Sequence, residues 1–259
     1  MIGAIAGDII GSIYESSPVK SEEFPLFSEG SRFTDDSVLS VATADVLMHG
    51  GDYAAAYRHW YRRYPKAGYG QGFRSWAETP GAPAYGSLGN GSAMRVSPVG
   101  WACSNLESVN REARRSAVVS HNHPEGVKGA QAIAVAVFLA RRGESKPDIR
   151  RRLETAFGYR LNRSLAEIRL NYRFDATCPG SVPEAVIAFL QSHDFESAVR
   201  GAISLGGDAD TQACMAGAVA EAFYGGVPPD IQVPALSRLD TEMLKVVEAF
   251  AGRFLVPLA

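Results

Sequence analysis

The stretch GGDADTQACMAGAVAEAFYGG, residues 206–226, places a charged start directly before a strongly apolar helix. Asp208 and Asp210 stand one residue apart, and Thr211 follows them. One carboxylate is enough to cap a helix, and a cap is the simplest interpretation of such a residue taken alone. Here the helix is rich in alanine and is expected to be buried, and buried carboxylates need a cationic partner. No lysine or arginine lies within four residues of either aspartate, so the pair indicates a role beyond capping.

A second stretch, FTDDSVLSVATADVL at residues 33–47, repeats this pattern about 170 residues earlier. Thr34, Asp35 and Asp36 precede an apolar helix, and Arg32 is the one cation within four residues of them. Three successive side chains cannot all face one way on a helix, so we expect them in its non-helical entry. There their oxygens can converge beside the positive end of the helix.

Together with Glu15, at the end of the first predicted helix, the two motifs supply five carboxylates and two threonine hydroxyls. A ligand set made only of oxygen suits Mg²⁺ or Mn²⁺ rather than zinc. A set of this size is sufficient for two ions about 3.5–4 Å apart.

The periodicity of the remaining chain is helical, and runs of alternating β-branched residues are almost absent. We therefore predict an all-α fold in one compact domain over residues 1–259. Gly3, Gly7 and Gly11 share one face of the first helix and predict a close helix contact that excludes side chains. Residues 126–143 are apolar on nearly every side and predict a central helix. Further helices are expected at 36–50, 52–64, 108–120, 146–158, 183–192, 195–204, 211–225 and 241–255, with long irregular loops at 14–33 and 69–92.

Composition limits the classes of function. A net charge of −2 does not indicate a general nucleic-acid-binding protein. The three cysteines are widely spaced, which indicates neither a disulfide framework nor a zinc site and fits a reducing, cytoplasmic setting. The apolar N-terminus lacks a basic region and carries Asp8, so it is not read as a signal peptide. No other apolar run approaches the roughly 20 residues that a membrane helix needs. The oligomeric state is left open.

Two further segments are candidates for ligand contact. The glycine-rich loop YGSLGNGSAMRVSP, residues 85–98, is either a diphosphate cradle formed by backbone N–H groups or a plain connector. The segment SHNHPEG, residues 120–126, holds His121 and His123 without other nearby zinc ligands. These histidines therefore indicate either ligand contact or an ordinary helix entry.

Five segments, in this order along the chain, resemble the ADP-ribosylglycohydrolase family, which includes the dinitrogenase reductase-activating glycohydrolase and the vertebrate ADP-ribosyl-acceptor hydrolases. The segments are GAIAGDIIGSIYE, FTDDSVLSVATADVL, GSLGNGSAMRVSP, SHNHPEGVKGAQA and SLGGDADTQACMAGAVAEAFYG. The resemblance implies an all-α fold with a cleft that holds two Mg²⁺ ions, or Mn²⁺ in their place.

The resemblance also implies roles for individual residues. Glu15 matches a glutamate on a mobile segment that reaches the metals or guards the cleft, and His121 matches a ligand-contacting histidine of some relatives. Leu88 departs from the pattern, because some relatives place an aromatic side chain there against adenine. The matched metal ligands are Thr34, Asp35, Asp36, Asp208, Asp210 and Thr211, and the matched substrate-binding loop residues are Gly86, Ser87, Gly89, Asn90 and Gly91.

The implied reaction is hydrolysis of the bond between C1″ of ADP-ribose and an acceptor, by a metal-positioned water. The expected partner is an ADP-ribosylated substrate or ADP-ribose itself, and Glu15, Asp35 and Asp208 are the candidate catalytic carboxylates. Two alternatives remain: a non-catalytic ADP-ribose-binding protein on the same fold, and a metal-dependent phosphohydrolase. The acceptor is not fixed by the sequence.

Overall fold

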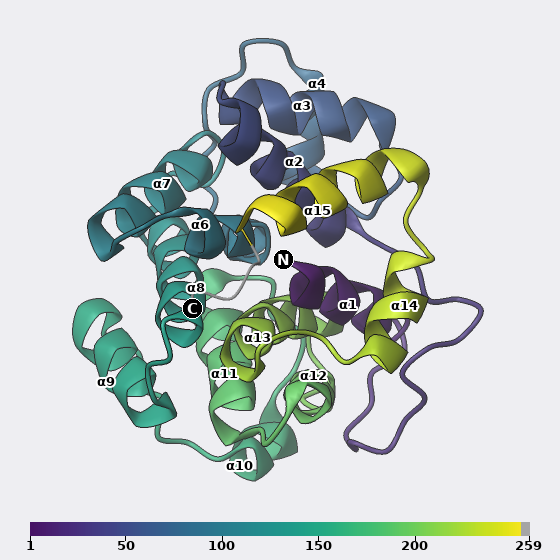
Figure 1. The fold of residues 1–259 in the computed structure, drawn as a ribbon, viewed down its shortest axis with the longest axis vertical. Helices are drawn as coiled ribbons and strands as arrows, with labels where there is room; N and C mark the ends of the chain where they lie inside the picture. Colours follow the sequence, from purple (N-terminus) through teal and green to yellow (C-terminus); the bar gives the residue numbers. More distant parts are fainter. Residues whose placement is uncertain (255–259) are drawn as a thin grey trace.

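The computed structural model describes residues 1–254, and within them the chain is helical with no extended strand. One isolated pair, Gly89 with Thr177, is the β-type contact of this part of the chain. The predicted all-α class is confirmed (Figure 1). The helices are α1 (Ile2–Gly11), α2 (Asp35–His49), α3 (Tyr53–Arg63), α4 (Gln71–Glu78), α5 (Gly91–Met94), α6 (Ser97–Ala102), α7 (Leu106–Val118), α8 (Pro124–Arg141), α9 (Lys146–Phe157), α10 (Leu165–Asn171), α11 (Cys178–Gln191), α12 (Phe195–Ile203), α13 (Ala209–Tyr224), α14 (Pro229–Leu236) and α15 (Thr241–Phe254).

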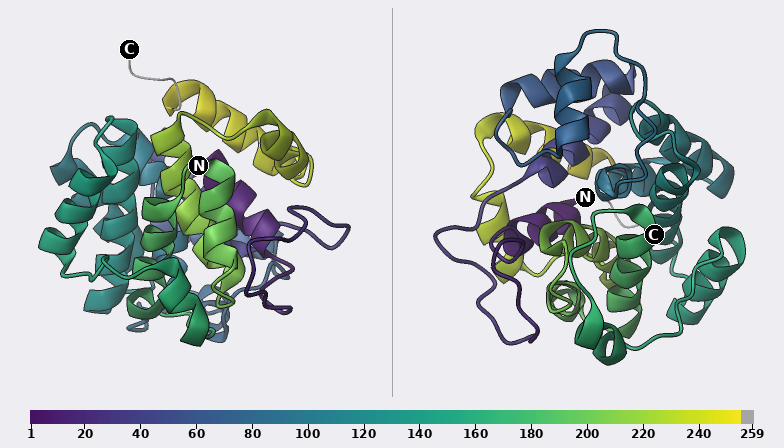
Figure 2. Two further views of the ribbon diagram at one scale, coloured as in Figure 1. Left: turned by 90° about the horizontal axis from the view of Figure 1, so that it is seen from below. Right: turned by 180° about the vertical axis from the view of Figure 1, so that it is seen from behind.

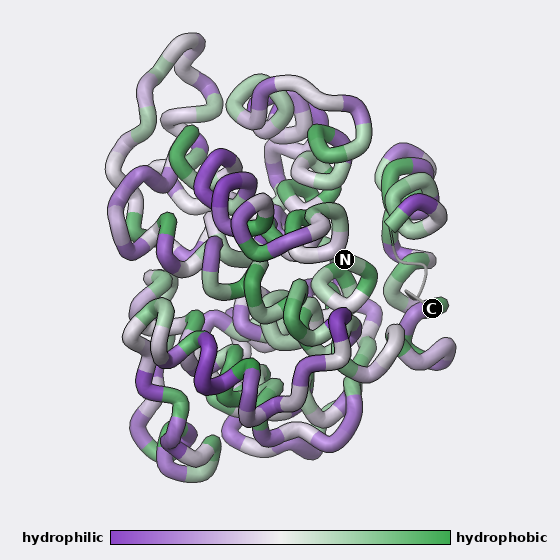
Figure 3. Tube along the Cα trace, turned by 60° about the vertical axis from the view of Figure 1, so that its left-hand side comes forward, coloured by the Kyte–Doolittle hydropathy of each residue, from purple (hydrophilic) through white to green (hydrophobic). Residues whose placement is uncertain are grey.

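Helices α1, α8 and α13 form the centre of the molecule. Almost every residue of α1 and α13 is buried, and α8 is buried along most of its length as the sequence predicts. The apolar colour in Figure 3 gathers on the inner helices, whereas the long outer loops are largely polar. None of the helices in residues 1–254 combines the length and apolar character needed to cross a bilayer.

The glycine face of α1 makes the contact that the sequence predicts. A Cβ atom on Gly7 would lie 2.1 Å from the carbonyl oxygen of Ala213, and one on Gly3 would lie 2.3 Å from that of Gly217. A Cβ atom on Gly11 would lie 2.5 Å from the Cα of Asp210. Helices α1 and α13 therefore touch backbone to backbone and lie side by side although about 200 residues separate them (Figures 1 and 2).

A carboxylate of α13 completes this contact at the other end of α1. The backbone N–H groups of Ile2 and Gly3 donate to Glu221, at 3.1 and 3.0 Å. The first N–H groups of a helix have no partner inside it, so Glu221 supplies the missing acceptor from the neighbouring helix.

The long segment of residues 12–34 leaves the end of α1 and loops outward before returning to α2 (Figures 1 and 2). Cationic side chains tie it to the body of the protein, one from the segment itself (Lys20) and one from α12 (Arg200). Lys20 Nζ donates to the carbonyl of Tyr172 at 2.6 Å, and Arg200 Nη1 donates to the carbonyls of Glu22 and Phe24 at 2.9 and 2.7 Å. The segment thus carries Glu15 past the start of α13.

Several short helices differ from the sequence prediction. Residues 69–92 were expected to be irregular, but they contain α4, whose Phe73 and Trp76 pack into the core. Helices α5, α6, α10 and α14 were not predicted either, because periodicity is weak evidence over four to eight residues. Helix α11 begins at Cys178, five residues before Pro183, because Thr177 caps it there and Pro183 lies inside the helix.

Candidate active site

A cavity of about 310 Å³ opens where the two acidic motifs meet. The contact is direct, since Thr211 Oγ1 donates to Asp36 Oδ1 at 3.3 Å. These two residues are 175 positions apart in the chain. The cavity wall includes all seven oxygen-bearing residues singled out in the sequence: Glu15, Thr34, Asp35, Asp36, Asp208, Asp210 and Thr211.

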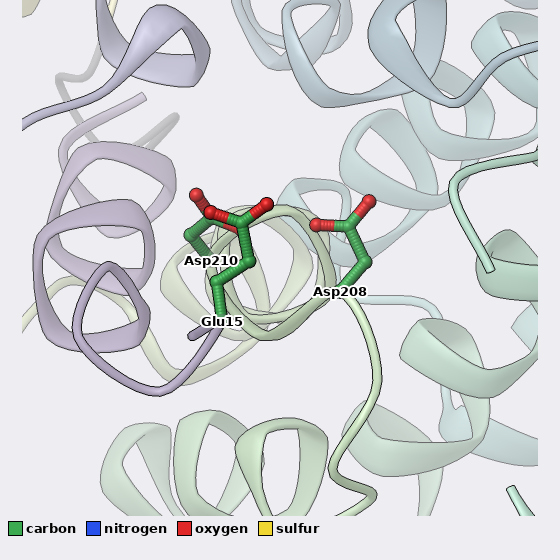
Figure 4. Close-up of side chains that lie close together, drawn as sticks. All are labelled: Glu15, Asp208 and Asp210. Carbon is green, nitrogen blue, oxygen red and sulfur yellow. The ribbon is translucent and has the colours of Figure 1, made fainter. Parts of the chain in front are cut away.

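Three of these carboxylates point at one small region. One oxygen each from Glu15, Asp208 and Asp210 lies within 4.8 Å of the others. Figure 4 shows the three side chains directed into the same space beside the start of α13, with Glu15 coming from the segment after α1. Oxygen atoms at this spacing are close enough to share a cation.

Asp208 stands at the N-cap position of α13 without performing a capping role. Its side chain makes no cap hydrogen bond, and its Oδ2 instead accepts from Asn90 Nδ2 at 2.8 Å. The turn before it depends on glycine: Gly206 has a φ of +63°, and a Cβ atom on Gly207 would lie 2.3 Å from the ring of Tyr172. The local backbone therefore aims Asp208 into the cavity rather than at its own helix.

The Thr-Asp-Asp motif is arranged slightly differently from the expectation. Asp35 and Asp36 already belong to the first turn of α2, and only Thr34 lies outside it, as the N-cap that accepts from the N–H of Asp36. The side chains of Asp35 and Asp36 still reach the cavity, because the first turn of a helix is open at its N-terminal end. The N–H of Asp35 donates to the carbonyl of Ala67 at 2.7 Å, which fixes this helix start.

Asp8 supports the site from behind the cavity wall, and the sequence reasoning missed it. It is fully buried in α1 and accepts from the N–H and Oγ1 of Thr34, at 3.0 and 2.6 Å. It also accepts from the N–H of Ser37 at 3.0 Å and from the Ser37 hydroxyl. Asp8 thereby ties the first turn of α2 to α1. The available signal was a lone carboxylate within an apolar helix, which must find donors if that helix is buried.

The carboxylates of the cavity lie close together, and Asp36, Asp208 and Asp210 are buried. Burial raises the pKa of Asp35 to about 8, with a further contribution from the charge of Asp8. Burial also raises the pKa of Asp36 and of Asp210 well above the ordinary range, and neighbouring carboxylates add to both shifts. No lysine or arginine of residues 1–254 forms an ion pair with these three aspartates, as judged by contacts within 4.0 Å.

Asp36 Oδ2 is buried without a hydrogen-bond partner in the described chain. An orphaned, buried carboxylate oxygen among like charges is costly unless a cation neutralises it. The donor set contains only oxygen, which is the chemistry that Mg²⁺ and Mn²⁺ prefer. The residues present therefore fit hard divalent cations.

The glycine-rich loop forms another wall of the cavity. Ser87, Gly89, Asn90 and Gly91 line it, whereas Gly86 is not among the lining residues and donates its N–H to Asn122 at 2.7 Å. Two N–H groups expected to face a diphosphate already have acceptors within the protein. That of Gly89 donates to Ser87 Oγ at 3.1 Å, and that of Asn90 donates to the carbonyl of Ala176 at 2.8 Å. The loop is therefore held by internal hydrogen bonds, and these two N–H groups already have acceptors within the protein.

The two histidines of residues 120–126 have different environments. His123 is the N-cap of α8, where its Nδ1 accepts from the N–H of Glu125 at 3.1 Å. His121 is buried and lines the cavity. His123 is therefore part of an ordinary helix entry, whereas ligand contact by His121 stays a prediction.

Exposed apolar side chains gather near the mouth of the cavity. Tyr85 and Phe174 both line it, and their exposed fractions are 39% and 57%. Leu88 is 36% exposed. Phe174 lies in the segment before α11, which the sequence reasoning did not single out, because a lone phenylalanine in a connecting segment has no distinguishing pattern.

The chain is similar in sequence to known ADP-ribosylhydrolases. A family model described as ADP-ribosylglycohydrolase matches residues 1–256. ADP-ribosylhydrolase ARH3 of Homo sapiens is 28% identical in sequence, and the match covers 87% of this chain and 84% of that protein. ADP-ribosylarginine hydrolase Tri1 of Pseudomonas putida (strain GB-1) is 25% identical, over 89% of this chain and 71% of that protein.

Solved structures include a similar fold. A chain of an ADP-ribosylglycohydrolase-related protein complex superposes with a TM-score of 0.70 at 25% identity, covering 96% of this chain and 95% of the other. The family model and this structural match both extend over nearly the whole sequence. The chain belongs to the ADP-ribosylglycohydrolase family.

Proposed function

We propose that the chain hydrolyses the bond between C1″ of ADP-ribose and an acceptor, in a cavity whose acidic residues hold two divalent cations. Membership of the family makes it a glycohydrolase that removes ADP-ribose from an acceptor. The observation that carries the cation-dependent mechanism is the meeting of the two acidic motifs through Thr211 and Asp36, beside the orphaned Asp36 Oδ2.

The proposed cation ligands are the oxygen donors at the starts of α2 and α13. When bound, Mg²⁺ or Mn²⁺ supplies Lewis-acid stabilisation of oxygen and lowers the pKa of an associated water. Two further residues hold these ligands in place, since Asp8 fixes Thr34 and Asn90 fixes Asp208. The proposed ligand set is Thr34, Asp35, Asp36, Asp208, Asp210 and Thr211.

Cleavage of the glycosidic bond develops positive charge on the ribose ring. The carboxylates of the cavity stabilise that charge. Glu15, Asp35 and Asp208 are the proposed acid–base carboxylates, because each borders the cavity. Glu15 is not among the proposed cation ligands, and its pKa is raised chiefly by burial. A carboxylate with a raised pKa accepts a proton from water more effectively near neutral pH. Glu15 is placed to orient water or substrate from the outer side.

A panel of defined substrates tests this function. ADP-ribose linked to arginine, to serine and to a nucleic-acid base, together with O-acetyl-ADP-ribose, is incubated with the protein in Mg²⁺, in Mn²⁺ and in EDTA. We expect intact ADP-ribose to be released from at least one substrate with metal and not in EDTA. Equal release in EDTA contradicts the metal role. Tight binding of ADP-ribose without turnover identifies a binding protein, and release of AMP or phosphate identifies a phosphohydrolase.

Phe174 is proposed to stack on the adenine ring in the absence of an aromatic residue at position 88. Stacking of a base on an aromatic side chain contributes about 1–3 kcal/mol, so Phe174→Ala is expected to raise the Kd for ADP-ribose roughly tenfold or more in calorimetry. Leu170→Ala is the matched control, because Leu170 is 81% exposed on α10 and does not line the cavity. An unchanged Kd in Phe174→Ala, or an equal loss in both variants, rules out the stacking role.

A further inference from the structure

Arg95 is a buried cation that the proposed mechanism leaves without a role. Its side chain is fully buried and borders the cavity, and its guanidinium lies 4.2 Å from the ring centre of Tyr57. Within residues 1–254 no carboxylate forms an ion pair with it. Its Nη2 donates to the carbonyl of Ser116 and to Ser120 Oγ, both at 3.0 Å. An arginine side chain can only donate hydrogen bonds, so the bond to Ser120 has a fixed direction.

The hydrogen bond from Arg95 also determines which atom donates in the bond between Ser120 and His121. The hydroxyl is fully buried, and besides Arg95 its one side-chain neighbour in the described hydrogen-bond network is His121 Nδ1, at 2.8 Å. A serine hydroxyl has a single proton and two lone pairs. Since one lone pair accepts from Arg95, the proton has one acceptor within reach, which is Nδ1. His121 Nδ1 is therefore the acceptor, and the ring proton lies on Nε2.

His121 Nε2 is directed at the glycine-rich loop. A Cβ atom on Gly91 would lie 3.1 Å from Nε2, and one on Gly89 would lie 3.5 Å from it. No hydrogen bond from Nε2 to another residue is formed within the described chain. Burial, followed by the charge of Arg95, lowers the pKa of His121 well below its ordinary value. The ring is therefore neutral at physiological pH, with its N–H beside the loop.

We propose that Arg95 and Ser120 are positioning residues that hold His121 in the Nε2–H tautomer, so that it donates a hydrogen bond to a phosphate oxygen of the bound nucleotide beside residues 89–91. The proposal rests on the proposed function for the identity of the ligand. The tautomer is a property of the protein alone. In the opposite tautomer Nε2 would present a lone pair, which repels an anionic oxygen.

The tautomer is measurable without turnover. In ¹⁵N-labelled protein, the imidazole nitrogen shifts distinguish a protonated Nε2 from a protonated Nδ1. We expect the free wild-type protein to show a neutral ring with the proton on Nε2. Ser120→Ala removes the donor to Nδ1 and is expected to populate the Nδ1–H form, whereas Ser120→Thr keeps the hydroxyl and retains the wild-type signature. Ser116→Ala is the matched control, because Ser116 is also buried, at the end of α7, but its hydroxyl donates to the carbonyl of Ala113.

Binding supplies the second readout. Ser120→Ala is expected to raise the Kd for ADP-ribose about tenfold, the size of one net hydrogen bond, while Ser120→Thr and Ser116→Ala stay near the wild-type value. A wild-type ring protonated on Nδ1, or a Ser120→Ala variant with unchanged tautomer and unchanged Kd, overturns the proposal. Absence of ADP-ribose binding and release in the wild type overturns the proposed function instead, because the tautomer in the free protein does not depend on the ligand.

Discussion

Asp36→Asn is expected to lower the rate of ADP-ribose release by about a thousandfold at saturating Mg²⁺, equivalent to roughly 4 kcal/mol of transition-state stabilisation. Asp36 is the point at which the two acidic motifs touch, and its second oxygen is the orphaned atom of the cavity. Asparagine preserves the shape and can still accept from Thr211, but it removes the negative charge. The measurement is single-turnover release of ADP-ribose from the best substrate of the panel.

The same variant is expected to be more stable than wild type when metal is absent. Burial raises the pKa of Asp36 in the native state, whereas in the unfolded chain a carboxyl group titrates near pH 4. The native state therefore loses stability as the pH rises above about 4 towards the native pKa. In EDTA at pH 8, Asp36→Asn should have the higher Tm, and the difference should shrink as the pH falls towards 4. Wild-type turnover in this variant, or a lower Tm in EDTA at pH 8, contradicts the assigned role.

Gly7→Ala is expected to destabilise the protein by about 3 kcal/mol or more. The clash would be with backbone atoms of a buried helix, which cannot move aside as a flexible side chain can. The added Cβ atom would lie 2.1 Å from the Ala213 carbonyl oxygen, and relief of that clash requires α1 to separate from α13. The measurement is the free energy of unfolding in urea, with catalytic activity followed in parallel.

Gly252→Ala is the matched control for this prediction. Gly252 lies in α15, and nothing lies within 4 Å of a Cβ atom placed on it. Alanine is favoured over glycine in a helix by roughly 0.5–1 kcal/mol, so this variant should be slightly more stable than wild type. If the two variants behave alike, the close contact between α1 and α13 is not what holds the fold.

The sequence predicted those features that combine an unusual composition with a regular spacing. Three glycines at intervals of four residues predicted the contact between α1 and α13, and the apolar run at 126–143 predicted the central helix α8. Asp8 was missed because one carboxylate has no periodicity, and its partners Thr34 and Ser37 become visible only when α1 lies against α2. The role of Asn90 in holding Asp208 was missed for the same reason, since the two residues are 118 positions apart.

Phe174 and the hydrogen-bonded chain from Arg95 to His121 show a different limit. Both depend on side-chain exposure and hydrogen-bond direction, which the spacing of residues along the sequence does not determine. The short helices α4, α5 and α10 were missed because a single turn or two of helix carries too few residues for a period to appear. The missed features are thus mainly those that tertiary contacts create.

The backbone contact between α1 and α13 has a consequence for biosynthesis. Residues 3–11 are synthesised about 200 residues before residues 209–217, which form their packing surface. Until then α1 can contact α2 through Asp8, but the helix that packs on its glycine face is missing and the cavity lacks Asp208 and Asp210. Contacts between such distant segments also slow folding, because a long loop must close before they form. A chain that stops before residue 208 therefore lacks the second acidic motif, and the cavity between the two motifs can form only after α13 has been made.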